Sequence, residues 1–171
     1  ESLGVYVNLE PYKRGFFEDH FGSYDGNVYE GTVSDFTESA LGTFEAKNND
    51  EDRLDFTEIT SVYDSLAIED DSFVDALWEY VDLEQFVRFW ALESLLLHSD
   101  GYSGNRNNYY LYGDPADQGR LKFLMWGADG ILNAYDVAED QPQSIYLKGV
   151  IAWRLYQVME WRVKYFEALD D

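Results

Sequence analysis

LLLHSDGYSGNRNNYYLYGDPADQGRLKFLMWGADG, residues 95–130, is the segment from which the rest of the chain can be interpreted. An apolar run with helical character leads into a polar loop that carries His98 and Asp100. Two aromatic-rich, strand-like runs follow, and Asp129 comes just after the second. Because functional side chains are commonly held on loops between rigid elements, we expect a functional site here.

The composition indicates a folded and strongly acidic domain. The 171 residues are the length of one domain, and 46% hydrophobic content with 18% aromatic residues is enough for a core. The chain carries 34 acidic and 12 basic side chains, a net charge of −22, so repulsion from phosphates argues against nucleic acid as a partner. Such an acidic surface is expected for a protein that works in salty water or binds divalent cations. It is equally explained as an aid to solubility.

Other bulk features exclude several classes of site. Cysteine is absent, which excludes disulfides, thiolate catalysis and cysteine-type zinc sites. No stretch approaches the roughly 20 apolar residues of a membrane span. The chain starts at Glu1 and runs directly into a strand-like segment, so we expect it to be a piece of something longer. We favour an extracellular or cell-surface location.

The first third of the chain has the pattern of a small sheet with one helix. Residues 3–9 and 28–33 are rich in β-branched and aromatic residues, which predicts two strands. Pro11 opens a short helical stretch between them. Residues 34–55 are polar and acidic, and we expect a surface loop or mobile insertion there.

Apolar periodicity predicts four helices in the remainder. The three- and four-residue steps place them at 57–67, 72–81, 82–97 and 144–169. The third of these has apolar residues on most of its circumference and is expected to be buried. The fourth is expected to be one long helix, with Trp153 and its other large residues in the core or packed against another lobe.

The spacing of polar residues in the loop agrees with a phosphoryl-transfer site. Asn105 lies five residues after Asp100, the offset of the catalytic loop of protein kinases, and Asp129 follows the second strand, where a kinase has its metal-binding Asp. Short motifs also arise by chance, so Asp100 can equally be a turn residue that ends a helix. His98 has the alternative of a buried, hydrogen-bonded histidine.

Four segments, in order along the chain, resemble the CotH kinase family, a group of atypical protein kinases named for a spore-coat protein. These segments are residues 4–10, 21–29, 100–112 and 126–129. The resemblance runs through nearly the whole chain. Its most specific part is Asp-Gly-Tyr at 100–102 followed by Asn-Asn-Tyr-Tyr-Leu-Tyr at 107–112.

The resemblance implies a protein-kinase-like fold and transfer of the ATP γ-phosphoryl group to Ser or Thr of a protein, assisted by Mg²⁺ or Mn²⁺. Asp100 is similar to the catalytic Asp that orients the hydroxyl or accepts its proton, and Asp129 to the metal-binding Asp. Kinase spacing selects Asn105 as the second metal ligand, whereas the family pattern selects Asn108, with Asn107 beside it. We favour Asn108, because a glycine-rich loop tolerates a length change better than a strand tolerates a register slip.

The chain departs from the family pattern at several positions. Gly127 stands where members often have an acidic residue, and Glu30 stands where some have Lys. Glu10 fits the family's Glu after the first strand and is a candidate to orient a phosphate-binding cation, with a surface ion pair as the alternative. Candidate cations for the nucleotide, each equally explained as a surface charge, are Lys13, Arg14, Arg106 and Lys122.

These patterns predict an α+β, kinase-like domain over residues 1–171. Residues 1–33 would be the end of an N-terminal lobe and 34–171 a mainly helical catalytic lobe. The predicted function is a metal-dependent protein kinase that uses ATP. The alternative is a non-catalytic, kinase-like scaffold or surface protein that holds Ca²⁺ with acidic residues such as those at 48–55, although no EF-hand spacing is present. The oligomeric state is not predicted.

Overall fold

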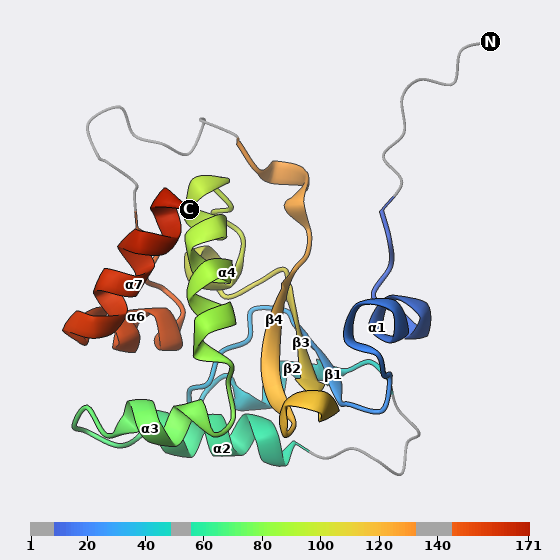
Figure 1. The fold of residues 1–171 in the computed structure, drawn as a ribbon, viewed down its shortest axis with the longest axis horizontal. Coiled ribbons are helices and arrows are strands. Elements are labelled where there is room, and N and C mark those ends of the chain that lie inside the picture. The colour runs from blue at the N-terminus through green and yellow to red at the C-terminus, as the bar shows by residue number, and fades with distance from the viewer. Residues whose placement is uncertain (1–8, 49–55, 133–144) are drawn as a thin grey trace.

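The computed structural model of the chain describes residues 9–48, 56–132 and 145–171. It is an α+β fold, as predicted, in which one antiparallel sheet has the strand order β2-β1-β3-β4 (Figure 1). The strands are β1 (Val28–Gly31), β2 (Phe44–Ala46), β3 (Tyr109–Asp114) and β4 (Arg120–Met125). The predicted strand at 3–9 lies almost wholly outside the described residues.

Helices cover both faces of this sheet. In Figure 1, α1 lies on one side and α4 on the other, with α6 and α7 beyond α4 and with α2 and α3 across the lower end. The α-helices are α1 (Arg14–Phe21), α2 (Thr57–Leu66), α3 (Phe73–Trp78), α4 (Leu83–Leu95), α5 (Tyr102–Asn105), α6 (Val150–Gln157) and α7 (Met159–Asp170). Short 3-10 turns are η1 (Leu41–Thr43), η3 (Pro115–Asp117) and η4 (Ala128–Gly130).

The alternation of side chains along β3 creates a separate core on each face of the sheet. Tyr109 and Leu111 face the larger core, which also contains the buried face of α4. Tyr112 faces the other way and packs with Phe17 of α1 and Val28 of β1. Because successive strand residues point to opposite faces, the run of aromatic residues at 109–112 supplies both cores.

Two contacts attach α4 to the edge strand β4. The Gln85 side-chain amide donates to the carbonyl of Phe123 at 2.7 Å, and the N–H of Phe123 donates back to Gln85 Oε1 at 2.9 Å. Gln85 therefore takes the place of a neighbouring strand at Phe123 and continues the cover of this edge that begins with the bridge between Val81 and Leu121. The chain segments that leave α4 and β4, which carry Asp100 and Asp129, are positioned relative to each other by this attachment.

The prediction of a surface loop at 34–55 is wrong over residues 34–48. Asp35 and Phe36 are about 1% exposed, and Phe44 is 5% exposed. The strand β2 lies in this segment and pairs with β1. The segment is polar overall, but it contains Phe36 and Phe44. Because aromatic side chains bury a large apolar area, these two residues hold the segment against the core. β1 also pairs with β3, so the strand before residue 33 and the strand after the candidate site belong to one sheet.

The prediction of one long helix at 144–169 is also wrong. Val158 is extended, with φ −86° and ψ 120°, and separates α6 from α7. The break lets α7 lie along α4, where the Tyr165 ring stacks on Trp90 with 3.9 Å between ring centroids. Trp153, expected in the core or packed against another lobe, is 50% exposed and so is not a core residue of the described structure. No helix in 9–48, 56–132 or 145–171 has the length and apolarity needed to cross a membrane.

Candidate active site

The candidate site begins where α4 ends. After Leu95 the chain leaves the helix through Leu97, which has a φ of 54°, and the N–H of His98 donates to the carbonyl of Glu93 at 2.8 Å. This tight reversal, followed by the single turn of α5, leaves the Asp100 side chain exposed. A carboxylate is thus presented to solvent at the end of the longest helix of the described structure.

Three asparagine side chains converge on the Asp100 carboxylate. Asn105 donates to Oδ1 at 2.8 Å and Asn108 donates to Oδ2 at 2.7 Å. Asn107 donates to both oxygens at 3.4 Å. Asn108, favoured from the sequence as the metal ligand, and its alternative Asn105 therefore contact the same carboxylate, one on each oxygen.

The direction of these hydrogen bonds determines what the amide oxygens can do. An ionised carboxylate only accepts hydrogen bonds, so each amide must turn its nitrogen toward Asp100 and its oxygen away. The Asn107 oxygen accepts from the N–H of Val33 at 3.2 Å. In the described part of the chain, the oxygens of Asn105 and Asn108 accept no hydrogen bond, which leaves them available to a cation.

The segment after β4 lies against the same asparagine. The N–H of Trp126 donates to the carbonyl of Asn108 at 3.0 Å. Gly127 has a φ of 57°, and a Cβ built on it would be 2.5 Å from Cγ and Oδ1 of Asn108. Asp129 follows in η4 with an exposed side chain. Asn108 therefore lies between Asp100 and the turn that carries Asp129, and the close approach explains why a glycine replaces the family's acidic residue.

His98 connects the two halves of the site without being exposed to it. Its ring is buried, and Nε2 lies 3.0 Å from the carbonyl of Trp126, which requires the proton on Nε2 because a carbonyl only accepts. Burial lowers the pKa of His98, while the hydrogen bond to Trp126 and the charges of Asp100 and Asp129 act in the opposite direction. Both carboxylates are thus close enough to act on one imidazole, which has the buried, hydrogen-bonded role considered for it above.

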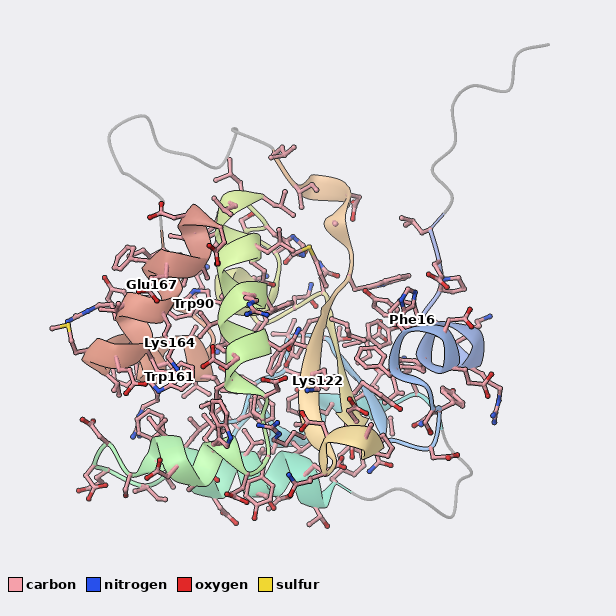
Figure 2. All side chains as sticks on the ribbon, viewed as in Figure 1. Phe16, Trp90, Lys122, Trp161, Lys164 and Glu167 are labelled. Carbon is pink, nitrogen blue, oxygen red and sulfur yellow. The ribbon has the colours of Figure 1, made fainter. Side chains whose placement is uncertain are left out.

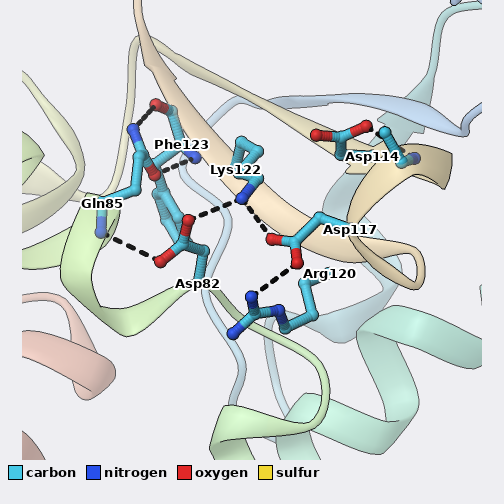
Figure 3. Close-up of polar contacts among 8 residues, drawn as sticks. Asp82, Gln85, Asp114, Asp117, Arg120, Lys122 and Phe123 are labelled. Carbon is cyan, nitrogen blue, oxygen red and sulfur yellow. Dashed lines mark hydrogen bonds and ion pairs between the residues drawn. The ribbon is translucent and has the colours of Figure 1, made fainter. Parts of the chain in front are cut away.

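The structure places Lys122 in an ion-pair cluster at the N-terminal end of α4 (Figure 3). Its ammonium contacts Asp82 at 2.5 Å and also Asp117, which pairs with Arg120 at 2.5 Å. Burial disfavours the charged ammonium, but the hydrogen bonds of Asp117 and Asp82 leave the pKa of Lys122 raised. Figure 2 shows Lys122 lower on β4, away from the end that leads to η4. These contacts attach the β3–β4 hairpin to α4 and do not bring Lys122 to Asp100.

The other two candidate contacts for a nucleotide are Glu10, next to α1, and Arg106, between two of the asparagines that contact Asp100. Glu10 is exposed and lies 3.1 Å from Nε2 of His20 in α1. Arg106 is half-buried, and its charge lowers the pKa of the buried Asp35, although burial of that carboxyl leaves its pKa raised overall. Glu10 thus has a partner in α1, whereas the buried Nε of Arg106 has no hydrogen-bond partner among the described residues.

Two more of the charged positions discussed above have partners as well. Arg14 pairs with Glu18 at 3.1 Å within α1. Glu30, at the position where some family members have Lys, forms an ion pair with Lys47. A cation therefore lies beside that position, supplied by the residue that follows β2.

The oxygen-rich donor set around Asp100 suits a hard divalent cation. Carboxylate and carboxamide oxygens are the ligands that Mg²⁺ and Mn²⁺ prefer, and Asp129 with the free amide oxygens of Asn105 and Asn108 would supply them. Within the described residues, no cluster of three or more His, Cys, Asp or Glu side chains could bind a metal by itself. A cation here would therefore depend on amide oxygens and on a bound phosphate.

The loop proposed for Ca²⁺ falls mostly outside the described residues, which omit 49–55. Asn48, its first residue, is used within the fold: its amide nitrogen donates to the carbonyl of Gly26 and its oxygen accepts from the N–H of Val28 at 2.9 Å.

The sequence reasoning missed two buried carboxylates next to this site, Glu93 and Asp35. Glu93 could have been found, because it lies three residues after Trp90 on the apolar face of α4, where an acidic residue is out of place without a partner. Asp35 carries no such signal, since the segment around it has no periodicity.

The family model described as CotH kinase protein matches residues 1–171, the whole chain. No curated protein matches the sequence.

Proposed function

The chain belongs to the CotH kinase family, and we propose that it transfers the γ-phosphoryl group of ATP to a serine or threonine hydroxyl of a protein, using Mg²⁺ or Mn²⁺. Membership of this family indicates a protein-kinase-like function. The observation that supports the finer proposal is the Asp100 carboxylate, which is exposed yet held by three asparagine amides.

Asp100 has the position and chemistry to act on the acceptor hydroxyl. Its carboxylate is exposed and only accepts hydrogen bonds, so an incoming hydroxyl can donate to it beside the asparagines. As the hydroxyl oxygen bonds to the γ-phosphorus, the bond from that phosphorus to the bridging oxygen breaks and ADP leaves with the electron pair. Asp100 takes the proton of the hydroxyl.

Asp129 and Asn108 are the residues that we propose as metal ligands, with Asn105 as a further one. Asn108 contacts both the Asp100 carboxylate and the turn that leads to Asp129, so it is the asparagine common to both halves of the site. A bound divalent cation would offset the negative charge of the nucleotide phosphates. This role matters in a chain of net charge −22, where a bare polyanion is repelled.

The contacts described above give no support to Glu10 or Lys122 as nucleotide ligands, whereas Arg106 stays a candidate because it lies between two asparagines that contact Asp100 and its Nε has no hydrogen-bond partner among the described residues. Lys122 in particular is held by two carboxylates in a cluster that joins β4 to α4. We therefore assign Glu10 and Lys122 no role in the proposed reaction.

Transfer of labelled phosphate from ATP to a general protein acceptor tests the proposal. We expect incorporation with Mg²⁺ or Mn²⁺, none with a chelator, and phosphoserine or phosphothreonine in the product. Calorimetry with a non-hydrolysable ATP analogue complements the assay. Binding of Ca²⁺ without the analogue, together with no transfer under any metal, would instead favour a non-catalytic scaffold.

A further inference from the structure

Two buried carboxylates contact the loop that carries Asp100. Glu93, in the last turn of α4, is 0% exposed. Asp35, in the segment after β1, is 1% exposed. They come from distant parts of the sequence, and both contact the residue Tyr102, which lies two positions after Asp100.

Glu93 holds the main chain of this loop. Its carboxylate accepts from the N–H of Tyr102 at 2.8 Å, from the N–H of Ser103 at 2.9 Å and from the Ser103 hydroxyl. These are the first N–H groups of α5, which a single turn of helix cannot satisfy internally. A side chain on Gly101 would collide with the Glu93 carboxylate, so the close approach requires glycine.

Asp35 holds the other end of the same residue. The Tyr102 hydroxyl donates to Asp35 Oδ1 at 3.1 Å and accepts from the N–H of Ile151 at 3.2 Å. The N–H of Val150 donates to Asp35 Oδ2 at 3.1 Å. Tyr102 is therefore fixed by its backbone to α4 and by its hydroxyl to the start of α6.

These carboxylates are a costly way to stabilise a core. Burial raises the pKa of Glu93 to about 7, against the effect of its hydrogen bonds to Ser103 and Tyr102, and burial also raises the pKa of Asp35. Well-packed apolar residues usually stabilise a core as well as or better than buried charges. What the two carboxylates add is a defined orientation of the groups that they contact, because each oxygen accepts from a donor at a defined place.

We propose that Glu93 and Asp35 are positioning residues that hold Tyr102, and through the adjoining main chain orient Asp100 toward the acceptor hydroxyl. The inference rests on the proposed phosphoryl transfer. It adds two residues that contact neither substrate nor metal. Loss of either contact lets the loop rotate while Asp129 and its strand stay in place.

The test compares Glu93→Gln and Tyr102→Phe with Ser94→Ala. Gln keeps the shape of Glu93 but cannot accept from both backbone N–H groups, and Phe removes only the hydroxyl that contacts Asp35. Ser94 is the control, since it is buried beside Glu93 but bonds to Trp90 and Tyr165 and not to the loop. Steady-state kinetics and amide hydrogen exchange over residues 100–108 are measured on each protein.

We expect both test variants to lower kcat by about tenfold to a hundredfold, since small misplacements of reacting groups have effects of this size, with little change in the KM for ATP. The amides of Tyr102 and Ser103 should exchange faster in Glu93→Gln. Ser94→Ala should change neither quantity. Unchanged kcat and unchanged exchange in Tyr102→Phe and Glu93→Gln would overturn the inference.

Two further outcomes are also decisive. If Glu93→Gln fails to fold, kcat and amide exchange measured on Tyr102→Phe test the same inference. If the wild-type protein transfers no phosphate, the proposed function fails, and the exchange data alone decide whether the two carboxylates hold the loop.

Discussion

Among single residues, Gly127 shows most directly how the site constrains the sequence. Its φ of 57° is unfavourable for residues with a side chain, and a Cβ would be 2.5 Å from the Asn108 amide. The residue therefore permits Asn108 and the Asp129 turn to approach each other. An acidic side chain at this position would require the asparagine to move.

Gly127→Ala should lower the free energy of unfolding by about 1–3 kcal/mol, because a strained backbone and a steric overlap add together. Chemical denaturation measures the change. Gly130→Ala is the matched control, since Gly130 ends the same turn without a positive φ, and a Cβ added there would meet no atom within 4 Å. Equal stability of the two variants would contradict the tight packing described here.

Glu93 makes a second prediction, on the pH dependence of stability. Its pKa is raised from 4.5 to about 7, so the folded protein binds a proton that the unfolded chain releases between those values. Stability from this group is therefore present below about pH 4.5 and is lost as the pH rises toward 7. The loss should reach about 3 kcal/mol at most, from 1.36 kcal/mol for each pKa unit.

Denaturation of the wild type and Glu93→Gln between pH 5 and pH 8 measures this effect. The wild type should lose stability relative to the variant as the pH rises, because Gln does not titrate and other groups cancel in the difference. The free energy of unfolding of Ser94→Ala should depend on pH in the same way as that of the wild type. A constant difference between wild type and Glu93→Gln would show that Glu93 keeps an ordinary pKa.

At the scale of elements, the attachment of α4 to β4 sets the relative position of the two segments that carry Asp100 and Asp129. The Gln85 amide pairs with both backbone groups of Phe123 on an edge strand. Gln85→Ala should lower the free energy of unfolding by about 1–3 kcal/mol, since it leaves two buried backbone groups without a partner.

Hydrogen exchange at Phe123 and denaturation together measure the effect of Gln85→Ala. The exchange should become faster at that amide. Gln157→Ala on α6, where the side chain makes one exposed hydrogen bond of 3.3 Å, is the control and should change stability by less than about 0.5 kcal/mol. Unchanged stability in Gln85→Ala would mean that the other contacts, apolar packing and the Asp82–Lys122 ion pair, hold α4 to the sheet.

The elements also show what the sequence could and could not predict. α1, α2 and α4 were predicted because apolar periodicity and turn residues mark them clearly. β2 was missed because three residues with one buried Phe are too short for a periodic signal. The division between α6 and α7 was missed because no Gly or Pro marks Val158, and the break depends on how α7 packs against α4.

Within the site, spacing and family resemblance identified Asp100, Asn105, Asn108 and Asp129 as candidates. Asn105 and Asn108 contact Asp100 within one loop, but the approach of the segment that leads to Asp129 depends on a contact far apart in sequence, between Trp126 and Asn108, which spacing does not reveal. Asp35 was beyond prediction for the same reason: its partners Tyr102 and Val150 are 67 and 115 residues away.

Across the whole molecule, the sheet and α4 position the segments that carry Asp100 and Asp129. The chain as a whole is strongly acidic, with a net charge of −22. This charge makes the proposed activity dependent on a divalent cation to offset repulsion of ATP. The central claim is that Asp100 orients the acceptor hydroxyl in phosphoryl transfer.

The most direct test is labelled-phosphate transfer by Asp100→Asn beside the wild type, with Mg²⁺ and with Mn²⁺. The variant keeps the size of the side chain and removes the charge that accepts the proton. We predict a fall in kcat of about 10²- to 10⁴-fold, the usual contribution of a positioned proton acceptor, with nucleotide affinity retained. Activity of Asp100→Asn equal to that of the wild type would contradict the account.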